Sequence, residues 1–295
     1  MKKYKKGFLL LAFNNTELDY VKMACCCALS IKSHLTHNHV SLVTDQNSLE
    51  WAEKSLGRDV LDHAFDYIQI KSHQNQSNER VHYDSPWTKF QAPFLNSNRA
   101  SAYEYSPYEE TILIDVDYLV MSNTLDLVWG NKEELLINKN ASTLRHEKFH
   151  SKNIRLNKAG INMYWATLIY FKKTKTTEML FNLTEFIKDN YLFYKHLYKF
   201  PGRLYRNDYS FSIALHILNG FLENNNFKSF PNPTIKTMDQ KDDIVEVEKD
   251  SILFLSHDPK KHWENLLVKL KNIDVHIMNK RSFIRHTDSL IKSFL

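Results

Sequence analysis

The stretch TILIDVDYLV, residues 111–120, carries two aspartates, Asp115 and Asp117, directly after a run of apolar residues. A short continuous apolar run is typical of a strand that is covered on both faces of its sheet. The two carboxylates, one residue apart, then lie near one point at the end of that strand. Carboxylate oxygens in this arrangement suit a Mg²⁺ or Mn²⁺ ion that binds a diphosphate. The alternative is a pair of carboxylates that only caps the strand.

The sequence before this stretch alternates between strand and helix patterns. Apolar runs predict strands at 7–13, 40–44, 67–70 and 111–114, and helix patterns occupy 18–34, 49–56 and 87–103. Strands that alternate with helices form right-handed crossovers and a mostly parallel sheet. We therefore expect an α/β fold in which helices flank a mostly parallel sheet. Ligands bind such sheets beyond the carboxyl ends of the strands, where this sequence places Asn14, Asp45 and Asp115.

The second half of the sequence is less regular. Strands are predicted at 164–171 and 251–255, and helices at 177–198 and 209–222, with long loops at 74–84 and 224–241. Residues 263–295 are expected to form two helices. We interpret residues 1–262 as one ligand-binding and catalytic domain and residues 263–295 as a helical C-terminal tail packed on it.

Composition excludes several classes of protein. Hydrophobic residues make up 43% of the 295 residues and charged residues 25%, values typical of a globular chain with a sizeable core. No run of 18 apolar residues occurs, so no transmembrane helix is expected. The basic start of the chain lacks a cleavage site and is interpreted as the approach to the first strand, which predicts a cytoplasmic protein. Glycine-rich P-loop and dinucleotide-binding motifs are absent.

The cysteines and the net charge are weaker signals. Cys25, Cys26 and Cys27 are consecutive within a predicted helix, where neighbours point about 100° apart, so a disulfide framework is excluded and small buried side chains are expected. A formal charge of +5 permits an anionic ligand without requiring one. Lysines and arginines mix with apolar residues in 263–295, which fits a membrane or nucleic-acid contact or, alternatively, helices packed on their own domain.

A histidine near the last predicted strand is a further candidate. His257 follows residues 251–255, and Lys260 and Lys261 come three and four residues later. A histidine at a strand end can complete a metal site, and neighbouring lysines can bind phosphates. The alternative is a histidine without a special role, since the chain has 14 of them.

Together these motifs resemble the GT-A-fold glycosyltransferases, above all the glycogenin-type family 8 enzymes, over about residues 7 to 265. The resemblance is carried by Asp115-Val116-Asp117 with Leu119-Val120 after it, by His257 to Trp263, and by Thr88-Lys89 upstream. Residues 105–112, YSPYEETI, also resemble a stretch of uncharacterised phage glycosyltransferase-like proteins. The resemblance implies a GT-A-like, Rossmann-like fold that binds a nucleotide sugar.

The resemblance also implies roles for single residues. Asp115, Asp117 and His257 would hold Mn²⁺ or Mg²⁺, and Asp208 would orient the acceptor hydroxyl or stabilise positive charge at the anomeric carbon; its alternative is a helix N-cap. The residues expected to contact the nucleotide sugar are Phe13, Asn14, Tyr20 (on the uracil), Lys89, Asp115, Val116, Lys260 and Lys261. The chain departs from the family at Trp165-Ala166-Thr167-Leu168, where the family has Asn-Ser-Gly-Val, and lacks the family's glutamine after Asp208.

The predicted function is metal-dependent transfer of a hexose, by resemblance from UDP-glucose or UDP-galactose and with retention, to an acceptor hydroxyl. The acceptor is either a glycan or a hydroxylated base in DNA. Two other functions stay open: a non-catalytic nucleotide-sugar-binding protein of the same fold, and a metal-dependent nuclease or phosphatase. The sequence leaves the oligomeric state open.

Overall fold

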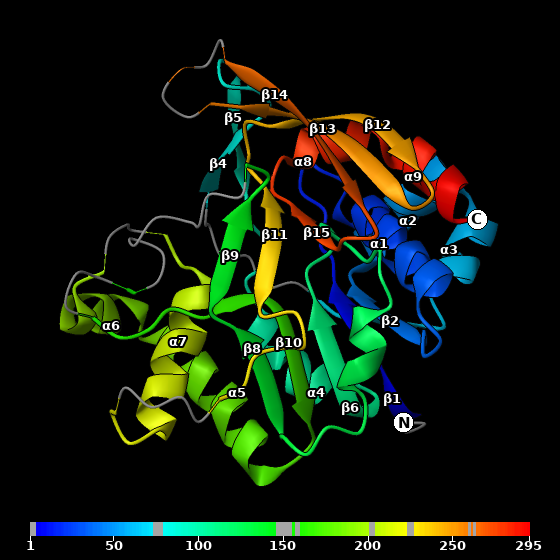
Figure 1. Cartoon of the computed structure of the whole chain (residues 1–295). Coiled ribbons are helices and arrows are strands. Elements are labelled where there is room, and N and C mark those ends of the chain that lie inside the picture. The colour runs from blue at the N-terminus through cyan, green and yellow to red at the C-terminus, as the bar shows by residue number, and fades with distance from the viewer. Residues whose placement is uncertain are drawn as a thin grey trace.

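A six-stranded sheet forms the centre of the part of the chain that the computed structural model describes, which is residues 4–72, 79–145, 155–156, 160–200, 204–222, 227–258, 261 and 264–295 (Figure 1). Its strands, in spatial order, are β3 (Tyr67–Ile70), β2 (Val40–Thr44), β1 (Tyr4–Leu11), β6 (Tyr108–Ile114), β10 (Trp165–Lys172) and β8 (Leu135–Asn138). The first four are parallel, and β10 runs antiparallel to both of its neighbours. This confirms the predicted α/β class with a mostly parallel sheet.

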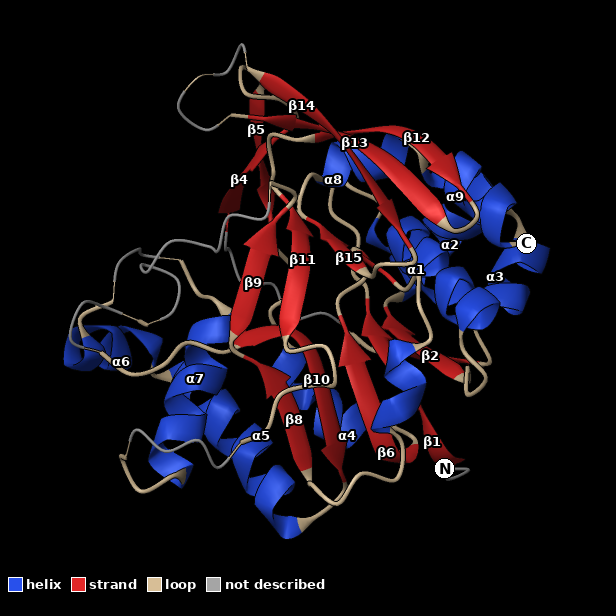
Figure 2. Cartoon of the chain, in the orientation of Figure 1, coloured by secondary structure: helices blue, strands red, loops and turns tan. Residues whose placement is uncertain are grey.

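Helices flank the strands on both sides of the view in Figure 2. One group is α1 (Tyr20–His34), α2 (Gln46–Leu56) and α3 (Arg58–Ala64); the other is α5 (Lys175–Asp189), α6 (Tyr191–Tyr198) and α7 (Asn207–Leu218). Short helical turns are η1 (Arg99–Ser101), α4 (Ala102–Tyr105) and η2 (Thr124–Val128). The helical C-terminus, also as predicted, consists of α8 (Lys280–Arg285) and α9 (Thr287–Phe294), and α9 packs on α1.

Helix α1 is buried along most of its length. It begins where the Asp19 carboxylate accepts the Lys22 N–H at 2.9 Å, which satisfies a backbone donor that the helix itself leaves unpaired. The three consecutive cysteines in its centre are fully buried free thiols, as expected. Burial raises the pKa of each of them, so they behave as small apolar side chains.

A second, smaller sheet stands over the carboxyl end of β6. It contains β7 (Tyr118–Leu119), β15 (Val275–Ile277), β11 (Thr234–Met238) and β9 (Asn140–Thr143), in that order. β15 is antiparallel to β7 and places His276 opposite Tyr118. A strand from near the end of the chain therefore lies beside the Asp115–Asp117 segment.

Several predictions of secondary structure are wrong. Residues 87–103 do not form one helix, because β5 (Lys89–Pro93) pairs with β4 (Glu79–Tyr83) in a hairpin, and a residue before proline disfavours the helical conformation. Residues 263–295 contain the two expected helices, but β14 (Asn265–Lys271) and β15 precede them. The predicted helix 177–198 is divided at Asn190 into α5 and α6.

The strand predicted at 251–255 exists, but it belongs to a separate sheet and not to the central six-stranded sheet. It is β13 (Ser251–His257), the centre of an antiparallel sheet with β12 (Asp243–Glu248) and β14. The predicted loop 224–241 contains β11, and β4 lies within the predicted loop 74–84, whose residues 74–78 fall outside the described part of the chain. No helix in the described residues is long and apolar enough to cross a bilayer.

We expect Gly7→Ala to lower stability by about 1–3 kcal/mol, the usual range for overpacking a core. A β-carbon at Gly7 would lie 2.3 Å from the Tyr108 ring and 2.7 Å from the His39 carbonyl oxygen. Tyr108 cannot move away freely, because it is buried and hydrogen-bonded to Ser41. Urea unfolding, with the exposed Lys5→Ala as control, measures the difference; an unchanged midpoint for Gly7→Ala would contradict this packing.

We also expect a pH-dependent contribution from Asp242, in the turn that precedes β12. Its carboxylate accepts the His257 and Asp239 N–H groups and is 2% exposed, and burial raises its pKa to about 6. Because the folded state holds the proton more tightly than the unfolded chain, this group's contribution to stability falls as the pH rises from about 4 to about 6.

Asp242→Asn removes that pH dependence, whatever the fixed effect of its altered hydrogen bonds. The stability of the variant relative to wild type should therefore rise by about 2–3 kcal/mol between pH 4 and pH 7. Chemical denaturation across this range measures the change, with the exposed Asp62→Asn as control. A relative stability that does not change with pH would show that Asp242 titrates normally.

Candidate functional site

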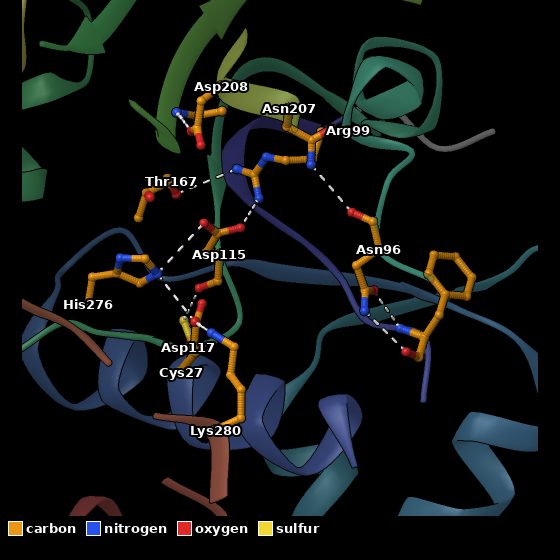
Figure 3. A network of polar contacts seen from close by, with 12 residues as sticks. Cys27, Asn96, Arg99, Asp115, Asp117, Thr167, Asn207, Asp208, His276 and Lys280 are labelled. Atoms are coloured by element: carbon orange, nitrogen blue, oxygen red, sulfur yellow. Dashed lines mark hydrogen bonds and ion pairs between the residues drawn. The ribbon is translucent and has the colours of Figure 1, made fainter. Parts of the chain in front are cut away.

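Asp115, Asp117 and His276 form a compact cluster at the carboxyl end of β6. One ligand atom from each residue lies within 4.8 Å of the others (Figure 3). His276 Nε2 is 3.2 Å from Asp117 Oδ2 and 4.0 Å from Asp115 Oδ2. Asp117 and His276 are 4% and 8% exposed, while Asp115 is the more open of the three. Such a set of donors can hold a divalent cation.

Main-chain hydrogen bonds fix the position of this cluster. The Asp115 N–H donates to the Thr167 carbonyl of β10 at 2.9 Å, and the Tyr118 N–H donates back to the Asp115 carbonyl at 3.1 Å. The Ile277 N–H donates to the Asp117 carbonyl at 2.8 Å, which attaches β15 to the turn between the two aspartates and β7. The turn after β6 is thus held from both sides.

Two cationic side chains pair with the two carboxylates. Arg99, from η1, donates to Asp115, and Lys280, from the start of α8, pairs with Asp117. Burial lowers the pKa of Lys280 to about 8, although Asp115 opposes this effect. The pairing matters because a buried carboxylate without a partner is strongly unfavourable.

The His276 ring can bind a cation in its neutral form. Burial lowers its pKa, and this outweighs the opposite effect of Asp115 and Asp208. Nε2 faces the carboxylates, whereas the buried Nδ1 has no hydrogen-bond partner among the described residues. When the proton is on Nδ1, the lone pair of Nε2 is available to a cation held between the ring and the two aspartates.

The cluster opens into a cavity of about 650 Å³. Its walls come from the end of β1 and the start of α1, the β4–β5 hairpin, the β6–β7 turn, the start of β10, the segment before α7, and β15. The charged residues of these walls are Arg80, Arg99, Arg206, Lys280, Asp115, Asp117 and Asp208. A cavity of this size accommodates a nucleotide-sized ligand.

Asp208 lies across this cavity from the cluster, in the first turn of α7 (Figure 3). One carboxylate oxygen accepts the Ala166 N–H at 2.9 Å, and the other accepts from Arg206 Nη2 at 2.8 Å. It does not cap the helix, because Arg206 occupies the N-cap position. Its position is thus set by β10 and by the neighbouring arginine.

Several predicted residues do line the cavity. They are Tyr20, Asp115, Val116, Asp117 and Asp208. The Tyr20 hydroxyl is buried and has no hydrogen-bond partner among the described residues. Whether these side chains contact a ligand stays a prediction.

Phe13 and Asn14 shape the turn after β1. The Asn96 side chain accepts the Phe13 N–H at 2.8 Å and donates to the Phe13 carbonyl at 3.1 Å. Asn14 donates to Asp19 at 2.9 Å and accepts the Val21 N–H at 3.0 Å. Asn14 lines a separate open groove beside α2 rather than the cavity.

The histidine beside the aspartates is His276 and not the predicted His257. His257 ends β13, in the separate three-stranded sheet, and its ring packs edge-on against Trp87 with 5.8 Å between centroids. Lys89 is exposed on β5 and is not among the residues that line the cavity. The cation that contacts Asp115 is Arg99 instead. Lys261 is exposed and pairs with Glu264 at 2.7 Å, and Lys260 lies outside the described residues.

Sequence reasoning missed His276, Lys280 and Arg99. The segment Asp274-Val275-His276-Ile277-Met278-Asn279-Lys280 alternates polar and apolar residues before a helix, which is a strand signal. It was missed because the basic residues around it fitted a helical tail. Arg99 offered no signal, since its role depends on the fold of η1 against β6.

Neither a protein-family model nor a curated protein matches this chain. Among solved structures, the glycosyltransferase GlyE of Streptococcus pneumoniae TIGR4 is similar at 14% identity and a TM-score of 0.42, over 78% of this chain and 46% of GlyE. This chain therefore spans less than half of GlyE.

The galactosyltransferase LgtC, in complex with donor and acceptor sugar analogs, is similar at 10% identity and a TM-score of 0.46, over 97% of this chain and 95% of LgtC. Mouse xyloside xylosyltransferase 1 gives 12% identity and a TM-score of 0.42, over 72% and 82% of the two chains. All three are named as glycosyltransferases, the class that the motifs predicted.

We expect His276→Ala to weaken Mn²⁺ binding by at least tenfold, because it removes one donor of the cluster. His257→Ala should leave the affinity unchanged, since that ring contacts Trp87 instead. Titration of free Mn²⁺, followed by its electron paramagnetic resonance signal, compares the two variants. A larger loss for His257→Ala than for His276→Ala would contradict the cluster.

Proposed function

We propose that this protein is a metal-dependent glycosyltransferase that uses a nucleotide sugar. The observation that carries the proposal is the Asp115–Asp117–His276 cluster, which faces a 650 Å³ cavity together with Arg99 and Lys280. A divalent cation and two basic side chains around one cavity are suited to a diphosphate. Cleavage of a sugar–diphosphate bond is the chemistry that such a site favours.

Mn²⁺ is the ion that we propose for the cluster. Two carboxylates and one imidazole form a mixed oxygen and nitrogen donor set, which Mn²⁺ accepts more readily than Mg²⁺. His276 Nε2, 3.2 Å from Asp117 Oδ2, supplies the nitrogen donor. When bound, the ion supplies charge stabilisation for the departing diphosphate.

Arg99 and Lys280 bind phosphate oxygens in this proposal. Both side chains already lie against the cluster, and the N–H fork of Arg99 matches the geometry of a phosphate. Their positions are fixed by η1 and by the start of α8, so little ordering is needed when the ligand binds. Burial lowers the pKa of Lys280, and a bound anion would oppose this effect because it favours the charged form of the side chain.

Tyr20 and Asp208 act on the two other parts of the ligand. Tyr20, at the start of α1, offers its ring and a free hydroxyl to the base. Asp208 lies at the sugar, where its carboxylate stabilises positive charge at the anomeric carbon or accepts a hydrogen bond from the acceptor hydroxyl. Arg206 and the Ala166 N–H keep this carboxylate oriented.

The finer assignments follow the sequence resemblance. We propose UDP-glucose or UDP-galactose as donor and retention of configuration at the anomeric carbon. The acceptor is a hydroxyl of a glycan or of a modified DNA base, and a panel of both kinds distinguishes them. A nuclease or phosphatase is less favoured, because Asp208, the third carboxylate among the described residues of the cavity wall, is paired with Arg206 and is not one of the donors of the cluster.

The test is sugar release from a panel of nucleotide sugars with Mn²⁺, with Mg²⁺ and with EDTA. We expect wild type to hydrolyse one donor slowly in Mn²⁺, and Asp117→Asn to lose at least 100-fold of this rate, because it removes one ionised ligand. Lys261→Ala, on the exposed surface, serves as the matched control.

Each outcome of this panel separates the candidate functions. Metal-dependent binding of a nucleotide sugar without release, even with a broad acceptor panel, would favour the non-catalytic binding protein. Neither binding nor release for any donor would overturn the glycosyltransferase proposal.

A further inference from the structure

Arg80 differs from the other cations of the cavity wall. Arg99 pairs with Asp115, Lys280 with Asp117 and Arg206 with Asp208. For Arg80 the described residues provide no carboxylate partner.

The position of Arg80 is nevertheless well defined. It projects from β4, its guanidinium lies over the Phe94 ring at 3.3 Å from the centroid, and its Nη2 donates to the Tyr205 carbonyl at 2.9 Å. Stacking on an aromatic ring fixes the plane of a guanidinium while leaving its edge available to a ligand. With one of its five N–H groups assigned to Tyr205, the remaining donors have capacity for an anion.

The charge of the cavity wall points in the same direction. Among the described residues that line the cavity, four cationic side chains face three carboxylates. The two positive charges of a divalent cation and the two negative charges of a sugar-linked diphosphate cancel. Their binding therefore leaves the excess of one positive charge on the cavity wall unchanged. Burial lowers the pKa of Arg80; Tyr20, Asp208 and Asp115 oppose this effect and Arg206 adds to it, and a bound anion would favour the charged forms of both arginines.

Arg80 also lies on a particular side of the cavity. Its contact to Tyr205 is with the segment that leads into Asp208, and Arg206 comes between them in sequence. The cluster that faces the diphosphate is built by other elements, namely β6, β15 and the start of α8. Arg80 therefore contacts the Tyr205–Asp208 side of the cavity and is not one of the donors of the cluster.

We propose that Arg80, with Arg206 beside it, binds the carboxylate of a sugar acid of the uronic type. This inference rests on the proposed function and adds the class of sugar. The carboxylate is carried either by the donor sugar or by the acceptor, and both sources present the same planar anion to the guanidinium fork. A single negative charge matches the single excess positive charge of the wall.

The experiment measures binding by calorimetry in the presence of Mn²⁺. For the donor source, the probes are UDP, UDP-glucose and UDP-glucuronate. For the acceptor source, UDP-saturated protein is titrated with methyl glucuronide and with methyl glucoside. We expect wild type to prefer the carboxylate-bearing member of one pair by at least tenfold, and the pair that shows the preference identifies the source.

Variants assign the preference to Arg80. Arg80→Gln should reduce it to less than twofold while the affinity for UDP itself stays unchanged, and Arg80→Lys should retain part of it, because the charge remains without the fork. Arg281→Gln is the matched control, since Arg281 also stacks on a ring of this hairpin, Phe90, but pairs with Glu17 and does not line the cavity. Thermal unfolding of each preparation confirms that the variants fold.

Three results would overturn the inference. One is equal affinity for both members of each pair. Another is a loss of affinity for UDP in Arg80→Gln as large as the loss for UDP-glucuronate, which would make Arg80 a diphosphate ligand. The third is absence of UDP binding to wild type, which would also overturn UDP as the donor nucleotide of the proposed function, whereas the first two leave that function standing.

Discussion

The short antiparallel pairing between β7 and β15 is the contact on which the site depends. The Ile277 N–H bond to the Asp117 carbonyl holds the turn after β6 and at the same time brings His276 to the two aspartates. β7 and β15 are only two and three residues long. Strands of this length are not stable by themselves, so the pairing is maintained by the sheets around it, by β11 on one side and by the buried β6 beneath.

Mutual neutralisation determines the electrostatics of the site. Each aspartate of the cluster contacts a basic side chain from a different part of the chain, Arg99 or Lys280, and Asp208 repeats this arrangement with Arg206. Pairs of this kind keep buried charges tolerable and their positions fixed. The charged side chains of these pairs can bind a ligand when the charges of the ligand replace those of the paired side chain. Folding and ligand binding therefore rely on one set of residues.

The sequence was sufficient where the pattern was local. The predicted strands 40–44 and 67–70 coincide with β2 and β3, because short segments rich in β-branched, aromatic and other apolar residues are typical of strands. Asp115 and Asp117 were found from their position after such an element, and Asp208 from the family resemblance. His276 and the β4–β5 hairpin were not, because β15 has only three residues and the hairpin depends on contacts between segments distant in sequence. In such places tertiary pairing outweighs local propensity.

The order of the ligands along the chain has a consequence for how the protein is made. Asp115 and Asp117 are synthesised well before His276 and Lys280, because about 160 residues of the chain separate the aspartates from the histidine. All six strands of the central sheet precede residue 173, so this sheet can assemble during synthesis while the cluster is still incomplete. A chain interrupted near residue 270 would thus retain the sheet without a working centre. The proposed ion site would form only after the segment with His276 and Lys280 has been synthesised.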